Sequence, residues 1–464
     1  MIHVMIMPMD LKPLLEPKSI AVIGASRDPT KIGHVILKNL VEGGFSGQVY
    51  PVNPSAEVIL YQHSFASVKD IPSPVDCAII VTPVPAVTKV LQECADKGVK
   101  SAIIITSGFA EVGNVQGEEE IKRIAKESGM AVIGPNCMGL LNTATRVDSV
   151  FNPVYKLGRP KSGEIAFISQ SGAVGAAVMD LAAKMGVGVS LFVSYGNAAV
   201  VTETDLLEYL RDDPKTKVIA MYIEGVRDGR RFLEVAKEIT RRKPIILIKA
   251  GKTQAGTKAA ASHTAALAGD YQVYSAAFKQ AGIIEVESLT DLFDYSKIFL
   301  QPFPSGDRVG VITNGGGVGV LTTDWISAHG LKMASFSDAT SQALRQKMPV
   351  HVNIANPLDL AGDADSQLFK FAIDELMNDD NVDSLVLTPL MQTVSLDAGL
   401  IDVIAKASEQ MRKPIIVVTI GGDYTENNRK LIEESGVPTY TSSYVATRAL
   451  AKLTWYAMNH YQRE

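Results

Sequence analysis

Short aliphatic runs alternate with longer amphipathic stretches along the first third of the chain. The runs have the length and composition of buried strands: SIAVIG (19–24), GQVYPVN (47–53), DCAIIVT (76–82), SAIIIT (101–106) and AVIGPN (131–136). Helical patterns lie between them, at 35–43, 84–97 and 118–128. Because strand–helix–strand units form right-handed crossovers, this order predicts a parallel sheet and a Rossmann-like α/β domain over residues 9–151.

The same alternation returns twice, after Pro-containing linkers at 152–162 and 301–307. Apolar runs at 164–172, 189–196, 218–225 and 244–251 predict a second domain over 162–300. Runs at 308–317, 383–391 and 414–422, with a last helix from Ser443 to about His460, predict a third domain over 306–464. Both blocks open with a strand, a turn of small residues and an apolar helix, either by distant duplication or by convergence on a flavodoxin-like design.

Composition narrows the class of protein. Hydrophobic residues make up 46% of the 464 residues, and aromatic residues only 6%, a bias that suits parallel sheets covered on both faces. A net charge of −5 gives no basic field for nucleic acid, and no apolar run approaches the length of a membrane span. The apolar start is too short for a secretory signal, and either Met1 or Met9 is a candidate start. Three cysteines without a CxxC pair predict neither disulfides nor zinc, and favour a reducing cytoplasm.

A turn after the first strand, IGASRDPTKIG (23–33), is the first candidate for phosphate binding. Gly24 and Gly33 allow close approach of the backbone, the turn leads to a helix N-terminus, and Lys31 supplies a positive charge. The alternative is a tight strand-to-helix turn without a ligand. The glycine spacing departs from GxGxxG, and VNP (52–54) supplies no ribose-binding carboxylate, so the residues disfavour NAD.

Two further turns join a strand to a helix through small residues: SQSGAVG (169–175) and TNGGGVGV (313–320). Free backbone N–H groups and hydroxyls at such a junction can hold a phosphate dianion. In the first turn Ser169 or Ser171 also fits a helix cap, which uses the same N–H groups. Three consecutive glycines in the second turn favour close approach of a ligand, since a core does not require them.

His263 lies in AGTKAAASHTAALAG (255–269), where small residues surround it on both sides. Neutral imidazole is a good nucleophile near pH 7 and can carry a phosphoryl group. Glu224, after a strand in YIEGVRDGRRF (222–232), is a candidate to orient that imidazole. The alternative for Glu224 is an ion pair with Arg227 at the rim of the sheet.

Taken together, these residues resemble the alpha subunit of the ADP-forming acetyl-CoA synthetases, relatives of succinyl-CoA synthetase. The ordered matches are IAVIGAS, PTKIG, YPVNP, IIVTP, IITSGFAE, VIGPNCMGLLN, FISQSGAVG, IEGVRDGRRF, GKTQAGTKAAASHTAALAG, VGVITNGGGVGVLTTD and ANPLDL (355–360). The resemblance covers nearly the whole chain. It implies a CoA-binding Rossmann-like domain followed by two flavodoxin-like ligase domains.

The resemblance also implies roles for particular residues. His263 would be phosphorylated, with Glu224 as its supporting carboxylate. Phosphate-binding turns would comprise Ser169, Gln170, Ser171, Gly172, Asn314, Gly315, Gly316 and Gly317. The CoA site would draw on Gly24, Ala25, Ser26, Lys31, Asn53, Pro54, Thr82 and Thr106, and Asn136 would lie near the acyl group.

The implied reaction converts acyl-CoA, phosphate and ADP into a carboxylate, CoA and ATP through an acyl phosphate and a phosphohistidine. The three blocks leave no room for an ATP-grasp domain, so a separate beta subunit is implied, in an α2β2 assembly, with Mg²⁺ and the nucleotide on that partner. Two other classes of function stay open: a non-catalytic CoA-sensing subunit and, less favoured, an NAD(P)-dependent oxidoreductase. Acyl specificity, ADP against GDP and the physiological direction are not determined by the residues.

Overall fold

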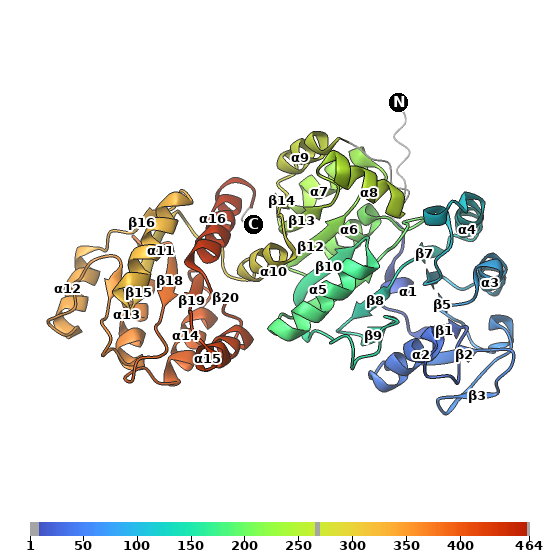
Figure 1. The fold of residues 1–464 in the computed structure, drawn as a ribbon, viewed down its shortest axis with the longest axis horizontal. Helices are drawn as coiled ribbons and strands as arrows, with labels where there is room; N and C mark the ends of the chain where they lie inside the picture. The colour runs from blue at the N-terminus through green and yellow to red at the C-terminus, as the bar shows by residue number, and fades with distance from the viewer. Residues whose placement is uncertain (1–8, 265–269, 462–464) are drawn as a thin grey trace. The chain divides into compact units, whose positions relative to one another are not determined.

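The computed structural model describes residues 9–461, except residues 265–269 and the side chains of residues 260–264. The chain divides into two compact units, Met1–Lys184 with Gly188–Leu289, and Met185–Val187 with Thr290–Glu464. Among the described residues, the first unit contains two large sheets and a two-stranded β3–β4 sheet, and the second unit contains one large sheet. Figure 1 shows the arrangement of the elements within each unit. None of the helices in the described ranges combines the length and hydropathy needed to cross a membrane.

The first sheet is parallel, with the predicted runs as its strands. Its order is β2 (Gln48–Val52), β1 (Ser19–Ile23), β5 (Cys77–Ile80), β6 (Ser101–Ile104) and β7 (Ala131–Ile133). The helices around it are α1 (Lys12–Leu15), α2 (Ile32–Glu42), α3 (Val84–Lys97) and α4 (Val115–Ser128), with 3-10 turns η1 (Val68–Asp70) and η2 (Ala110–Val112) and a β3–β4 hairpin (Val58–Ile59, Gln62–His63).

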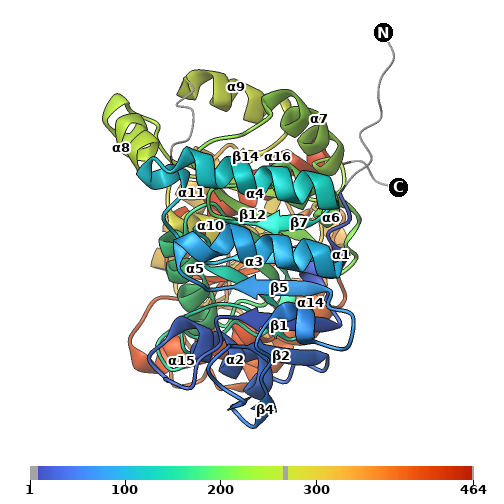
Figure 2. The same cartoon turned by 90° about the vertical axis from the view of Figure 1, so that its right-hand side faces the viewer.

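Alternate residues of β1 serve two cores. Ala21 and Ile23 pack in the cluster that includes residues of α3 and α4, and Figure 2 shows these helices lying across one face of the sheet. Ile20 and Val22 pack on the opposite side with residues of α1 and α2. Because side chains alternate across a strand, a continuous aliphatic run such as this fills both faces, which is the pattern that the sequence predicted.

The second sheet belongs to the same unit. Its order is β14 (Ile284–Glu285), β13 (Ile245–Lys249), β12 (Val218–Ile223), β10 (Ser162–Ser169), β11 (Val189–Ser194), β8 (Gly139–Asn142) and β9 (Val147–Asp148). Its helices are α5 (Gly172–Met185), α6 (Glu203–Asp212), α7 (Gly229–Ile239), α8 (Gln254–Thr264) and α9 (Tyr271–Gln280). Strands β8 and β9 lie within the range predicted for the first domain, yet β8 pairs antiparallel with β11.

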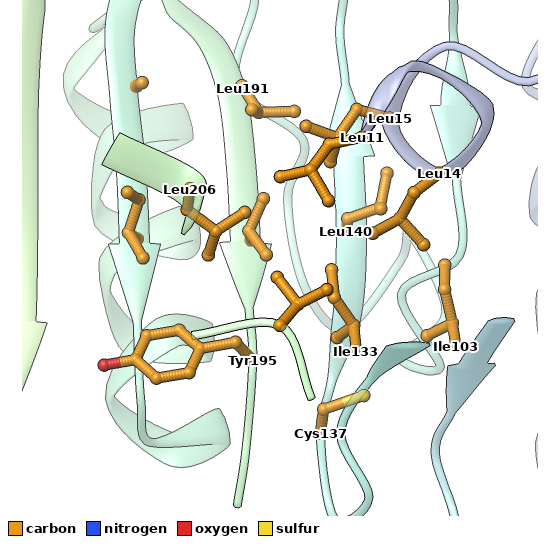
Figure 3. Packing of buried hydrophobic residues seen from close by; sticks show 14 of the residues in the cluster. Leu11, Leu14, Leu15, Ile103, Ile133, Cys137, Leu140, Leu191, Tyr195 and Leu206 are labelled. Carbon is orange, nitrogen blue, oxygen red and sulfur yellow. The ribbon is translucent and has the colours of Figure 1, made fainter. Parts of the chain in front are cut away.

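One hydrophobic core joins the first two sheets. Leu14 and Leu15 of α1 lie beside Leu140 of β8 in Figure 3, and Leu191 of β11 and Leu206 of α6 belong to the same buried cluster. Each of these side chains is at most 3% exposed. Burying a leucine side chain contributes about 1.5–3 kcal/mol, so this shared core fixes the two sheets as one body.

The second unit has the flavodoxin-like order. Its strands run β16 (Lys332–Met333), β15 (Arg308–Thr313), β18 (Ser384–Thr388), β19 (Ile415–Val418) and β20 (Thr439–Tyr440), with β17 (Leu358–Asp359) also paired to β15. The helices are α10 (Leu289–Ile298), α11 (Gly316–Ala328), α12 (Asp338–Lys347), α13 (Ser366–Asn378), α14 (Gly399–Glu409), α15 (Asp423–Glu434) and α16 (Ser443–Asn459). The strand pairs of this sheet are parallel, as predicted for the third block.

Candidate functional site

A cavity of about 560 Å³ lies at the carboxyl ends of the first sheet's strands. Open parallel sheets bind their ligands at this edge. The predicted site residues in its lining are Thr82, Thr106, Asn136, Gln170, Ser171 and Gly172. The cavity therefore joins strand ends of the Rossmann-like domain to the first small-residue turn of the second domain, two segments that the sequence proposed independently.

The other residues predicted for CoA lie at neighbouring strand ends and are outside this lining. They are Gly24, Ala25, Ser26, Lys31, Asn53 and Pro54. Asn53 Nδ2 donates a hydrogen bond to the Ala25 carbonyl at 2.7 Å, which ties β2 to the turn after β1. A Cβ at Gly33 would lie 2.0 Å from the Gly24 carbonyl oxygen, so close helix–strand packing alone accounts for this glycine. Lys31 is the N-cap of α2, and its side chain makes no capping bond.

The turn at 169–172 is held by its own hydrogen bonds. Ser169 is fully buried, and its Oγ donates to the Ser171 carbonyl at 2.7 Å. Ser171 Oγ accepts the Val174 N–H at 3.4 Å, a long bond for a helix cap. The N-terminus of α5 thus opens on the cavity with only weak side-chain capping, as an anion site at a helix N-terminus requires.

Glu224 follows β12 and is 7% exposed. The pKa of Tyr222 is raised to about 12, chiefly by burial. The negative charge of Glu224 and a hydrogen bond between the two side chains raise this pKa further. Lys249 Nζ donates to the Glu224 carbonyl oxygen at 2.8 Å and lies 4.7 Å from the centre of the Tyr274 ring. The guanidinium group of Arg227, a candidate partner of Glu224 from the sequence, donates to the Asn197 carbonyl at 2.7 Å. The backbone N–H of Arg227 donates to Glu203 Oε1 at 3.0 Å.

The predicted phosphorylation site falls at the edge of the described chain. The backbone of His263 lies in the last turn of α8, and its side chain, with residues 265–269, is outside the described residues. Helix α8 contacts η2 of the Rossmann-like domain. Thr257 Oγ1 donates to the Gly251 carbonyl at 2.9 Å and helps fix the first turn of the helix. The support of His263 by Glu224 stays a prediction.

The second glycine-rich turn lies in the second unit. Asn314 is 3% exposed, and its Oδ1 accepts the Leu390 N–H at 2.6 Å, so this side chain braces the turn. Helix α11 begins at Gly316 without a side-chain cap. A Cβ at Gly316 would lie 2.6 Å from Asp359 Oδ2, which places a carboxylate beside the helix N-terminus. Asp359 lies in the ANPLDL motif (355–360), and the sequence alone predicts no role for it.

The structure contains a buried polar cluster around Asn197 that the sequence motifs did not predict. Asn197 is 1% exposed, and its Nδ2 donates to Glu111 at 2.6 Å and to Glu118 at 2.9 Å. Its Oδ1 accepts a bond of 3.2 Å from Asn136, which lines the cavity. Burial opposes ionisation of Glu111, but hydrogen bonds from Gly108 and Asn197 outweigh it and lower the pKa of the carboxyl group. No local signal finds this cluster, because its members come from distant segments.

Cys137 and Met138 also line the cavity, next to Asn136. Burial raises the pKa of the Cys137 thiol to about 12, so it stays protonated at neutral pH. Met138 Cβ would lie 3.5 Å from a Cβ built on Gly172, which places this side chain beside the start of α5. Within the described parts of the chain, no group of three or more His, Cys, Asp or Glu side chains could hold a metal ion.

Comparisons with known proteins bear on this arrangement. Family models match the CoA binding domain at 18–143, the succinyl-CoA ligase like flavodoxin domain at 162–299 and the ligase-CoA domain at 309–461. The acetate–CoA ligase [ADP-forming] II subunit alpha of Pyrococcus furiosus is 42% identical over 91% of this chain and 93% of its own length. The chain belongs to the family of ADP-forming acetate–CoA ligase alpha subunits. The family and the fold class expected from the sequence are thus confirmed.

Two further proteins are similar to this chain over nearly its whole length. The solved structure of the dinucleotide forming acetyl-coenzyme A synthetase 1 of Candidatus Korarchaeum cryptofilum, in complex with phosphate and ADP, aligns with a TM-score of 0.90 at 39% identity, over 97% of each chain. The acetate–CoA ligase [ADP-forming] I of Archaeoglobus fulgidus is 41% identical over 96% of this chain, which spans only 63% of that longer protein. The family therefore contains chains of this length and longer ones.

Proposed function

We propose that this chain is the CoA-binding, His-phosphorylated alpha subunit of an ADP-forming acyl-CoA ligase. The observation that carries the proposal is the cavity, in which Thr82, Thr106 and Asn136 face the same space as the turn before α5. The relatives named above are ADP-forming acetate–CoA ligases, which makes acetyl-CoA the first substrate to test.

In the proposed reaction, inorganic phosphate attacks the thioester carbonyl of acyl-CoA, the C–S bond breaks, and CoA leaves as the thiolate. The acyl phosphate then transfers its phosphoryl group to His263, and the carboxylate leaves. Backbone N–H groups at Ser171 and Gly172 and the N-terminus of α5 stabilise the phosphoryl oxygens without reorganisation. Two phosphoryl transfers through a protein nucleophile replace one difficult exchange.

The second half of the proposal needs a nucleotide. The Pyrococcus furiosus relatives are named alpha subunits, which supports a partner subunit that binds ADP. That partner, an ATP-grasp chain in an α2β2 assembly, would supply ADP with Mg²⁺ and accept the phosphoryl group from His263. Co-purification of the tagged chain with such a partner, followed by ATP formation from acetyl-CoA, phosphate and ADP, tests this step. A chain that forms ATP alone would contradict it.

Labelling tests the role of His263 directly. The wild-type chain should incorporate ³²P from [³²P]phosphate and acetyl-CoA, and the acid lability of the label should be that of a phosphohistidine. His263→Ala should abolish the label, because no other nucleophile is proposed. His351→Ala provides a control, since His351 is an exposed residue of the second unit whose Nε2 lies 3.2 Å from Asp363 Oδ1. Full labelling of His263→Ala would refute the phosphohistidine.

Glu224→Gln should slow labelling of His263 at least about tenfold, because a neutral amide stabilises a cationic or phosphorylated imidazole less well than a carboxylate does. Binding of CoA should stay within about twofold, since Glu224 does not line the cavity. Isothermal titration with CoA and the time course of labelling separate these effects. An unchanged labelling rate would exclude Glu224 as the supporting carboxylate.

A further inference from the structure

Strand β13 ends on a buried lysine. Its first four residues, at 245–248, are isoleucine or leucine, whereas its last residue, Lys249, is only 5% exposed. Lys249 stands in register with Ile223 of β12, the residue that precedes Glu224. Burial of an ammonium group is unfavourable, so a lysine in place of a fifth aliphatic residue at this position requires an explanation.

Neutral groups hold the ammonium group of Lys249. Its Nζ donates to the Glu224 carbonyl oxygen at 2.8 Å and to the Ala250 carbonyl oxygen at 2.5 Å, and it lies 4.7 Å from the centre of the Tyr274 ring of α9. Among the described residues, no carboxylate forms an ion pair with this ammonium group. Two carbonyl dipoles and an aromatic face therefore fix the cation without cancelling its charge.

The charge of Lys249 acts on the carboxylates around it. Burial lowers the pKa of Lys249, the negative charges of Glu224 and of Glu285 on β14 oppose this shift, and the positive charge of Lys252 adds to it. The Glu224 carboxylate is thus near enough to attract the ammonium group, and the attraction is mutual.

Glu224 is fixed on both sides of its Cα atom. Gln170 Oε1 accepts the backbone N–H of Glu224 at 2.7 Å and that of Gly225 at 3.1 Å. Lys249 holds the carbonyl group of the same residue from the side of β13. Because planar peptide groups leave only two soft dihedral angles per residue, bonds to the N–H and to the C=O together set the direction in which the side chain leaves the backbone. Of these contacts, only the one from Lys249 comes from a charged group.

We propose that Lys249 is a positioning residue for the phosphorylation of His263, because its ammonium group fixes the Glu224 backbone and places a buried positive charge near the Glu224 carboxylate. The phosphoryl group that passes through His263 is negative as well, and a cation already held in place stabilises the assembled charges without reorganisation. Lys249 is not among the residues that line the cavity, so it acts through Glu224 and not on the substrate. The inference rests on the proposed function.

A matched pair of variants tests this role. Lys249→Met keeps the length of the side chain and removes both its charge and its donors. Lys243→Met is the control, since Lys243 precedes the opposite end of β13 and its Nζ donates to the carbonyl oxygens of Leu210 at 2.7 Å and Asp213 at 2.6 Å. Burial also lowers the pKa of Lys243. The control therefore removes the same kind of contact at a distance from Glu224.

The assay measures the rate of ³²P labelling against the concentrations of phosphate and acetyl-CoA. Lys249→Met should lower the maximal rate at least about tenfold and keep both KM values within about threefold, because the substrate cavity is intact. Lys243→Met should keep the maximal rate within about twofold of wild type. An unchanged maximal rate in Lys249→Met, with or without a raised KM, overturns the inference.

The dependence of the maximal rate on pH tests the charge of Lys249. A nearby positive charge opposes protonation of the groups that carry out the transfer. The decline of the labelling rate at low pH should therefore begin at a higher pH in Lys249→Met than in wild type or Lys243→Met. Identical profiles in the three proteins would show that Lys249 contributes no charge to the reaction and would contradict the inference.

Hydrogen exchange read by mass spectrometry keeps this inference distinct from the proposed function. The segment 224–227 should exchange faster in Lys249→Met than in wild type or Lys243→Met, because loss of the bond to the Glu224 carbonyl loosens the segment. If wild type is not labelled, the phosphohistidine proposal fails, and faster exchange in Lys249→Met still supports the hold on Glu224. If wild type is labelled and the segment exchanges equally in the variant and the wild type, the inference alone fails.

Discussion

Asn197 offers the sharpest test of how the first unit is held together. The change Asn197→Asp replaces an NH₂ group with an oxygen of nearly the same size and leaves the backbone contacts in place. In the wild type that NH₂ group donates to Glu111 and Glu118 at 2.6 and 2.9 Å. The variant places three carboxyl groups together in a buried setting, where Asn197 is only 1% exposed.

The magnitude follows from the two lost bonds. Hydrogen bonds to charged groups contribute about 1.5–3 kcal/mol each, so the loss in free energy of unfolding is about 3–6 kcal/mol at neutral pH. The cost should shrink as the pH falls from neutral toward the ordinary carboxyl pKa, because the new buried carboxyl group takes up a proton, which donates one hydrogen bond and removes the repulsion. The penalty is therefore present above the ordinary carboxyl pKa and lost below it.

Equilibrium urea unfolding of the chain at pH 7.5 and pH 5 measures this difference, with circular dichroism and CoA binding as probes. CoA affinity should fall as well, because Asn197 holds Asn136, which lines the cavity. Asn427→Asp, on the exposed surface of α15, adds the same charge as a control. A difference of less than about 1 kcal/mol between Asn197→Asp and wild type at pH 7.5 would refute the account.

Three further outcomes follow from particular contacts. Gly196→Ala should weaken CoA binding at least about tenfold, as measured by titration calorimetry. Gly196 has φ +60°, and a Cβ at this position would lie 2.3 Å from the Asn136 carbonyl oxygen in the cavity wall. An unchanged affinity for CoA would contradict this prediction. Burial raises the pKa of Cys77, Cys94 and Cys137 to about 12. A thiol-reactive disulfide reagent at pH 8 should therefore modify these cysteines only as the chain unfolds, and fast modification of the folded chain would contradict this. Burial opposes ionisation of Asp383, but hydrogen bonds from Arg308 and Ser305 lower the pKa of its carboxyl group, so the charged form should stabilise the fold above pH about 4 and lose that effect at lower pH. Asp383→Asn should therefore have a lower free energy of unfolding at pH 7 and a weaker dependence of that free energy on pH in acid. Equal acid-unfolding profiles of the variant and the wild type would contradict this account.

The sequence alone determined the order of the parallel-sheet domains and the positions of the candidate turns. Continuous aliphatic runs such as 76–82 and 101–106 were sufficient, because a strand covered on both faces must be apolar at every position. The small residues of 169–172 marked a helix N-terminus, since that property is local to a few neighbouring residues. The ordered motifs also sufficed to name the family.

Contacts between distant segments were decided only by the tertiary structure. Strand β8 joined the second sheet by pairing with β11, although its sequence continues the first domain. Gln170 met Glu224, and Asn197 met Glu111 and Glu118, across separations that carry no periodic signal. Apolar periodicity reports which face of an element is buried, whereas the partner of a buried polar side chain depends on how separate elements pack, so the chain encodes it only through the complete fold.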